Sequence, residues 1–166
     1  MQLEFLIELL TKAKERGIHT CIDTSGVVFD AMNEEKLLLF EELVKVTDLV
    51  LLDMKHVEDE AHKKLTGHSN QNVLDFASFL EEKKVPIWIR YVIVPGITDK
   101  KEEWIKLADY IRTLTNFEHL EILPYHKMGL YKYKKLGIEY PLKDTRAYTK
   151  EEAVEAYEFI MKECQK

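Results

Sequence analysis

Apolar residues recur along the chain in two alternating patterns, which predict strands and helices in turn. Short runs of apolar and β-branched residues predict strands, and stretches with apolar residues three or four positions apart predict helices. The predicted strands are residues 18–24, 48–53, 86–94 and 120–123. The predicted helices are residues 3–13, 37–44, 58–65, 73–80, 104–114 and 149–161. Because the strands are apolar throughout, this order predicts an α/β fold, in which crossover helices cover a parallel sheet of about four strands.

Three of the predicted strands end abruptly in charged or hydrogen-bonding side chains. The segments are Asp23-Thr-Ser-Gly26, Leu52-Asp53-Met-Lys55 and Leu123-Pro-Tyr-His126, and a fourth strand carries Arg90 in its interior. In α/β folds, ligands bind at the carboxyl ends of the strands. We therefore expect these polar side chains to gather at one rim of the sheet.

Polar residues before the apolar stretches predict where several helices begin. Asn70 or Asn72 is placed to cap the helix at residues 73–80, and Asp99 to cap the helix that contains Trp104. Thr149-Lys-Glu-Glu152 has the spacing of a capping box at the start of the last helix.

Composition indicates a single domain that covers residues 1–166. The chain is 46% hydrophobic and 33% charged, which suffices for one continuous core. Its net charge is −6, whereas binding to phosphate backbones requires a clustered positive surface. A general nucleic-acid or membrane binder is therefore not expected, and the lysine-rich stretch at residues 127–135 is interpreted as a solvated loop.

The two cysteines predict neither a metal site nor a redox pair. Cys21 lies inside an apolar strand, where we expect it to be buried in packing contacts, and Cys164 lies near the end of a charged helix. They do not form a C-x-x-C pair. Neither a signal peptide nor a run of about 18 apolar residues is recognisable, so we expect a cytoplasmic protein.

The chain is too short for a closed eight-stranded barrel, which needs about 250 residues. Its 166 residues are therefore expected to form an open sheet or a partial barrel. The chain also begins on a predicted helix with no strand before it, which suggests that Met1 is not the natural start. In that case the strand at residues 18–24 is an unprotected edge, which favours self-association.

Several stretches together resemble one known family. They are Gly17-Ile-His-Thr-Cys-Ile-Asp-Thr-Ser-Gly26, Asp48-Leu-Val-Leu-Leu-Asp-Met-Lys55, Trp88-Ile-Arg-Tyr-Val-Ile-Val-Pro-Gly96 and Glu121-Ile-Leu-Pro-Tyr-His126, with Lys132-Tyr-Lys-Lys-Leu-Gly137 beyond them. In this order and at these separations, they resemble the glycyl-radical-enzyme activating enzymes of the radical S-adenosylmethionine superfamily. The resemblance extends from residue 3 to about residue 163 and is strongest to the members that act on pyruvate formate-lyase.

Two motifs of this family are absent from the 166 residues. One is a C-x-x-x-C-x-x-C loop, whose three thiolates hold a four-iron four-sulfur (4Fe-4S) cluster. The other is a Gly-Gly-Glu strand end, which binds the amino group of the cofactor. Both lie upstream of the part that the chain resembles. The resemblance therefore implies a C-terminal fragment, which supplies the last four strands of a (β/α)6 partial TIM barrel and is expected to be inactive alone.

The resemblance also implies a monovalent cation site beside the cofactor. Its ligands match the carboxylates of Asp23 and Asp53, the hydroxyl of Thr24 and the carbonyl of Leu51. Oxygen ligands of this kind suit a hard cation. On the sequence alone, the two aspartates have an alternative role as caps of the turns that follow their strands.

Lys55, His126 and Arg90 are the other expected cofactor-binding residues. Lys55 matches the lysine that pairs with the carboxylate of S-adenosylmethionine, although a lysine just beyond a strand is otherwise usually solvated. His126 matches the histidine that contacts the adenosine part. Arg90 suits a cofactor carboxylate, peptide carbonyls or an ion pair under the sheet, and these alternatives remain open.

The function that the resemblance implies is radical chemistry on a partner protein. The reduced cluster donates an electron to S-adenosylmethionine, which is cleaved to a 5′-deoxyadenosyl radical. That radical removes a hydrogen atom from a glycine of pyruvate formate-lyase or a related glycyl radical enzyme. The cofactor supplies the reactivity and the protein the orientation.

Two other classes of function remain open at this stage. One is an aldolase-type lyase, with Lys55 as the Schiff-base nucleophile and with Asp23 and Asp53 as proton carriers. The other is a non-catalytic module that binds a protein through its open sheet edge or its lysine-rich segment.

Overall fold

A parallel four-stranded sheet forms the centre of the molecule. The computed structural model describes residues 2–166. The strands pair in chain order, all of them parallel. They are β1 (Cys21–Thr24), β2 (Leu49–Asp53), β3 (Ile87–Ile93) and β4 (Phe117–Pro124). The α/β fold predicted from the sequence is therefore confirmed.

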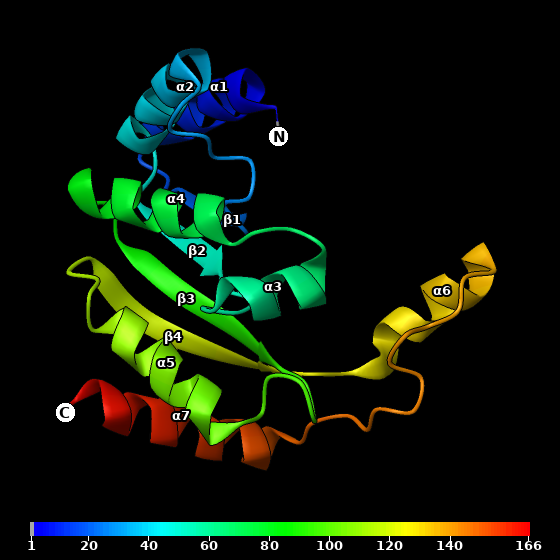
Figure 1. Cartoon of the computed structure of the whole chain (residues 1–166). Coiled ribbons are helices and arrows are strands. Elements are labelled where there is room, and N and C mark those ends of the chain that lie inside the picture. The colour runs from blue at the N-terminus through cyan, green and yellow to red at the C-terminus, as the bar shows by residue number, and fades with distance from the viewer. Residues whose placement is uncertain (1) are drawn as a thin grey trace.

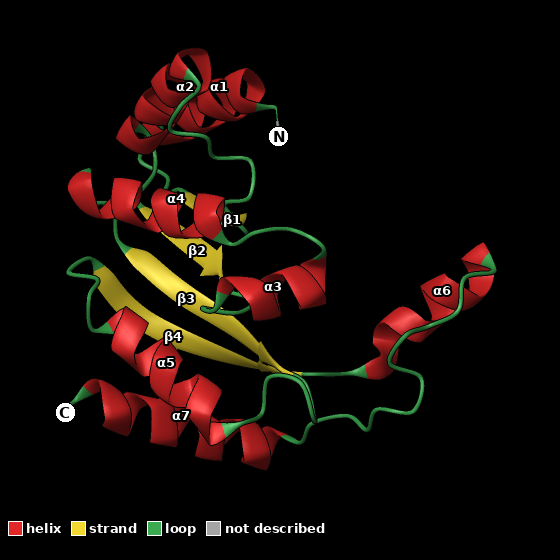
Figure 2. Ribbon diagram, viewed as in Figure 1, coloured by secondary structure: helices red, strands yellow, loops and turns green. Residues whose placement is uncertain are grey.

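The helices that cover the sheet all lie on one of its faces (Figure 1). They are α1 (Leu3–Lys14), α2 (Glu34–Lys45), α3 (Asp59–Thr66), α4 (Gln71–Glu82), α5 (Lys101–Ile111), α6 (Leu130–Leu136) and α7 (Lys150–Cys164), with a 3-10 turn η1 (Lys127–Gly129) before α6. The helices α4, α5 and α7 lie against the sheet, whereas α6 projects away from it (Figure 2). Within residues 2–166, no helix combines the length and the apolar character needed to span a membrane.

Burial alternates along the strands, because the helices cover only one face. In β3, Ile87, Ile89 and Ile93 are fully buried under the helices, whereas Trp88 and Arg90 are only partly buried on the opposite face. The apolar runs had predicted strands covered throughout. The structure instead leaves one face open, as expected for part of a barrel wall.

Cys21 is exposed, so the prediction that it is buried is wrong. It lies in β1, whose side chains alternate between the two faces. Ile22 points toward the helices and is buried, while Cys21 and Asp23 lie on the open face. A short apolar run does not reveal which of its residues face the core.

Three predicted caps at helix starts have different outcomes in the structure. The capping box at Thr149 and Glu152 is present at the start of α7. Asp99 does not cap α5, since its Oδ1 accepts the Gly96 amide at 2.8 Å and closes the turn after β3. Asn70 occupies the position before α4, but its side chain makes no cap bond and donates elsewhere.

The sequence predicted a solvated loop for the lysine-rich stretch. The structure instead contains η1 and α6 in this region. No residue of α6 is buried. Three of its seven residues are lysines, and this charge favoured the interpretation as a solvated loop.

Candidate functional site

The candidate site lies where the parallel strands end. Register pairing places Asp23 of β1 beside Leu51 of β2, and Asp53 of β2 beside Arg90 of β3. Asp23, Asp53 and Arg90 share the open face, because each is in phase with the partly exposed positions of its strand. The sheet thus brings together three side chains that are up to 67 residues apart in the sequence.

Arg90 bridges the two carboxylates. Its Nη1 donates to Asp23 Oδ2 at 2.8 Å, and its Nε and Nη2 donate to Asp53 Oδ1 at 2.8 and 2.7 Å. Lys55 Nζ donates to Asp53 Oδ2, also at 2.8 Å. These four residues, Asp23, Asp53, Lys55 and Arg90, are called the rim cluster below. Two positive and two negative side chains leave the rim cluster without net charge.

Asp53 is the most enclosed carboxylate of the rim cluster. Burial alone would raise the pKa of Asp53, but hydrogen bonds from Lys55 and Arg90 outweigh it, and the pKa lies below its usual value. Burial opposes the charge of Arg90, yet the bonds to Asp53 and Asp23 raise the pKa of Arg90 overall. Asp53 and Arg90 therefore stay charged at neutral pH.

Asp23 and Lys55 retain free binding capacity. The side chain of Asp23 is 57% exposed and that of Lys55 is 34% exposed. A lysine ammonium has three N–H donors, of which Lys55 uses one on Asp53, and Asp23 has a second carboxylate oxygen. The rim cluster thus offers one exposed anion and one partly exposed cation, the two charges that the amino-acid end of a zwitterion would pair with.

Three of the four predicted cation ligands, Asp23, Asp53 and Thr24, already bind groups of the protein. Arg90 lies between Asp23 and Asp53, and Thr24 Oγ1 accepts the Gly26 amide at 3.1 Å. No group of three or more His, Cys, Asp or Glu side chains suitable for a metal ion occurs in the described part of the chain. The monovalent cation site remains a prediction.

His126 lies two residues beyond the end of β4, at the same end of the sheet. Its Nδ1 accepts the Met128 amide at 3.4 Å and caps η1. No hydrogen bond or ion pair within residues 2–166 joins it to the rim cluster. The structure therefore places His126 at the start of η1 and leaves its imidazole exposed.

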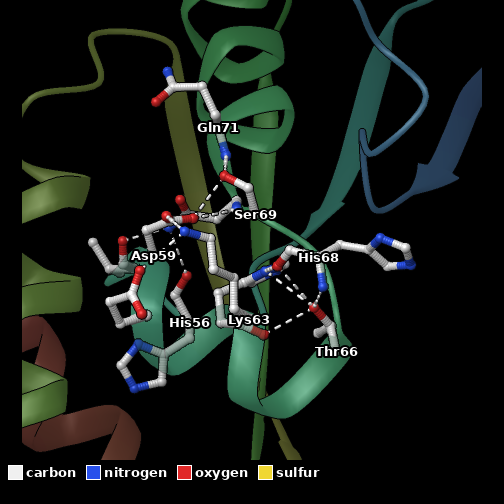
Figure 3. Close-up of polar contacts among 11 residues, drawn as sticks. His56, Asp59, Lys63, Thr66, His68, Ser69 and Gln71 are labelled. Carbon is white, nitrogen blue, oxygen red and sulfur yellow. Dashed lines mark hydrogen bonds and ion pairs between the residues drawn. The ribbon is translucent and has the colours of Figure 1, made fainter.

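A buried polar network, which the sequence reasoning missed, fixes the segment after Lys55 (Figure 3). Asn70 is 2% exposed, and its Nδ2 donates to the carbonyls of His56 and Val57. Asp59 Oδ1 accepts from the Asn70 amide at 3.0 Å and from Ser69 Oγ at 2.6 Å. The only sequence signal is a run of polar residues before α4, which was interpreted as a helix cap.

His56 ties the same segment to α5. Its Nδ1 accepts the Glu58 amide at 3.1 Å, so its Nε2 carries the proton, and Nε2 lies 3.0 Å from Glu103 Oε2. Burial lowers the pKa of His56, although Glu103 acts in the opposite direction. His56 and Asn70 thus hold the backbone on the carboxyl side of Lys55.

A family model for the radical SAM superfamily matches residues 1–108. The chain belongs to this superfamily, whose members use S-adenosylmethionine and a 4Fe-4S cluster.

The similarity to curated proteins is more specific. The pyruvate formate-lyase-activating enzyme of Staphylococcus epidermidis is 48% identical over 163 residues, and that of Staphylococcus aureus is 46% identical over 162 residues. Each match covers 96% of this chain and 63% of the relative. The chain thus spans less than two thirds of the length of these relatives.

Two solved structures share the fold. A domain of pyruvate-formate lyase-activating enzyme from Bacteroides vulgatus has a TM-score of 0.73 at 20% identity, covering 97% of this chain and 86% of that one. TYW1 with a lysine-pyruvate adduct has a TM-score of 0.62 at 12% identity, covering 95% and 45%. At these identities the likeness concerns the fold alone.

Proposed function

We propose that these residues form the cofactor-orienting part of an enzyme that generates the glycyl radical of pyruvate formate-lyase. The rim cluster carries the proposal, because it presents an exposed anion and a partly exposed cation at the ligand end of the sheet. The similarity to two pyruvate formate-lyase-activating enzymes supports this choice of reaction. The expected location is the cytoplasm.

Each residue of the rim cluster has a distinct role in the proposal. Lys55 binds the carboxylate of the cofactor, and Asp23 remains available for a positively charged or hydroxyl group. Asp53 holds Lys55 in place, and Arg90 holds Asp53. His126 contacts the adenosine part from the β4 end. When bound, S-adenosylmethionine supplies the radical chemistry, and the chain fixes its orientation.

A 4Fe-4S cluster needs three thiolates in this family, and the 166 residues contain two cysteines. Cys21 lies on the open face of β1, and Cys164 lies at the end of α7, on the side of the sheet that the helices cover. The two thiols therefore do not converge on one site. We accordingly expect the 166-residue chain alone to yield no 5′-deoxyadenosine above background.

The two alternative functions have less support. Schiff-base chemistry uses a desolvated lysine, whereas Lys55 is one-third exposed and bound to Asp53 at 2.8 Å. In a purely non-catalytic binding module, the charged side chains of the rim cluster would have no ligand to bind.

The decisive residue-level test uses a protein of the relatives' full length that contains these residues. Lys55→Ala is expected to weaken binding of S-adenosylmethionine by about tenfold or more, the loss of one charged hydrogen bond. Lys36→Ala on α2, an exposed lysine away from the rim, is the matched control. Calorimetric titration with equal affinities for the two variants would refute the role of Lys55.

A further inference from the structure

One short segment has a charge opposite to that of the rest of the chain. Residues 127–138, the basic arm, contain four lysines and no acidic residue. The whole chain has a net charge of −6, so the rest carries −10. Lys127 donates to the Lys143 carbonyl and Lys135 lies over the Tyr131 ring. No lysine of the basic arm has a carboxylate partner in the described chain, so its charge is uncompensated.

The basic arm also exposes apolar side chains. Its helix α6 buries no residue, whereas α4 buries five. Five large apolar side chains of the basic arm are 41–73% exposed, and they are Met128, Leu130, Tyr131, Leu136 and Ile138. Exposed apolar groups rimmed by polar residues often mark surfaces that bind another protein.

The base of the basic arm is nevertheless held firmly. The Tyr125 and Tyr140 hydroxyls are 2.8 Å apart, and the ring of Tyr133 packs edge-on against Tyr140 at 4.8 Å. Lys127 Nζ donates to the Lys143 carbonyl at 3.0 Å. The basic arm is therefore organised before any partner binds, which lowers the entropic cost of association.

The position of the basic arm connects it with the candidate site. It begins directly after His126, and α6 extends outward beyond the ends of β3 and β4 (Figure 1). A large molecule bound to the basic arm is thereby held at the rim of the sheet. The four lysines of the basic arm are too few for the extended positive surface that follows a phosphate backbone, so a nucleic acid is not the expected ligand.

We infer that the basic arm is a docking element for an acidic, apolar-centred surface of the protein substrate. The inference rests on the proposed function and identifies the partner by its chemistry. Docking through the basic arm supplies affinity away from the reacting glycine and brings that glycine toward the rim.

The test measures binding of pyruvate formate-lyase to a protein of the relatives' full length. The double variant Lys132→Glu/Lys134→Glu reverses two charges of the basic arm. The matched control, Lys36→Glu/Lys162→Glu, makes the same charge change on two exposed lysines of α2 and α7. At low ionic strength we expect about tenfold weaker binding for the first variant and less than about twofold for the control. The difference should shrink at high salt.

A second readout separates docking from damage to the fold. With a short peptide that contains the acceptor glycine, the variant of the basic arm should keep the wild-type kcat/KM, since the peptide is too short to reach α6. Equal losses of kcat/KM on the peptide and on pyruvate formate-lyase would overturn the inference. Equal affinities of the two double variants for pyruvate formate-lyase would also overturn it. A change in the mass of the enzyme alone would identify the basic arm as a contact between copies and would also overturn it.

The same measurements distinguish the inference from the proposed function. Wild-type protein that binds pyruvate formate-lyase but generates no glycyl radical would refute the proposed function and leave docking intact. Wild-type protein that does not bind it would refute both.

Discussion

Arg90 and Asp53 are register partners on adjacent strands, and Arg90 Nε donates to Asp53 Oδ1 across 2.8 Å. The same Asp53 carboxylate accepts from Lys55 through its other oxygen. The position of Lys55 at the rim therefore depends on an ion pair between β2 and β3. Sheet pairing and ligand binding are linked through one carboxylate.

Arg90→Gln is expected to lower the free energy of unfolding by about 2 kcal/mol, because it removes charged hydrogen bonds from a carboxylate in a partly buried setting. Urea unfolding measures the loss. The control is Arg112→Gln, whose pair with Asp109 lies on the exposed surface of α5 and should contribute about 0.5 kcal/mol or less. Equal effects of the two variants would show that the bridge to Asp53 is not stabilising.

The Asp59 carboxylate should make stability depend on pH in acid. Hydrogen bonds from Lys63, Ser69 and the Asn70 amide lower the pKa of Asp59 to about 2 from an ordinary value of 3.8. The unfolded chain therefore binds this proton at higher pH than the folded chain. The contribution of Asp59 to the stability of the fold is therefore complete above about pH 4 and is lost as the pH falls toward 2.

Asp59→Asn keeps the acceptor oxygen but removes the titration. We expect its stability to fall less steeply than that of the wild type between pH 4 and pH 2, as measured by thermal unfolding at several pH values. Parallel curves for the two proteins would contradict the assignment.

Asn70→Ala is expected to destabilise the protein by about 2 kcal/mol, because it leaves the His56 and Val57 carbonyls without their buried donor. It should also loosen the segment after Lys55, which hydrogen exchange detects as faster exchange at residues 54–58. Asn72→Ala is the control, since Asn72 makes one exposed bond to the Val27 carbonyl. Unchanged exchange at residues 54–58 would argue against the network as the support of Lys55.

Sequence patterns predicted the sheet because each strand is a compact apolar run that ends in polar residues. They also located Asp23, Asp53 and Lys55, whose place at strand ends is a property of the chain itself. The partner of Arg90 was not predictable, because it depends on the register of two strands and not on local sequence. Cys21 was assigned to the wrong face for the same reason.

Elements that make few core contacts were the least predictable. The helix α6 buries no residue, and the three lysines among its seven residues favoured the interpretation as a loop. Asn70 resembles a helix cap by position, whereas its amide group crosses to another segment of the backbone. In both cases the structure is set by contacts that local periodicity does not encode.

The strand β1 pairs with β2 on one side and forms an edge of the sheet on the other. We expect the 166-residue chain to self-associate through this edge, because unpaired backbone groups there accept a further strand. Cys21→Lys places a charge on the exposed side of β1 and should reduce the mass measured by light scattering over a range of concentrations. A wild-type chain that stays monomeric at all concentrations would contradict this expectation.

The most direct test of the proposed function is electron paramagnetic resonance of pyruvate formate-lyase. A protein of the relatives' full length is incubated anaerobically with pyruvate formate-lyase, S-adenosylmethionine and a reductant. We expect a glycyl radical signal with the wild type, a strongly reduced signal with Lys55→Ala, and no signal with the 166-residue chain alone. A full wild-type signal that is unaffected by Lys55→Ala, or no signal from the wild type, would contradict the role proposed for the rim cluster.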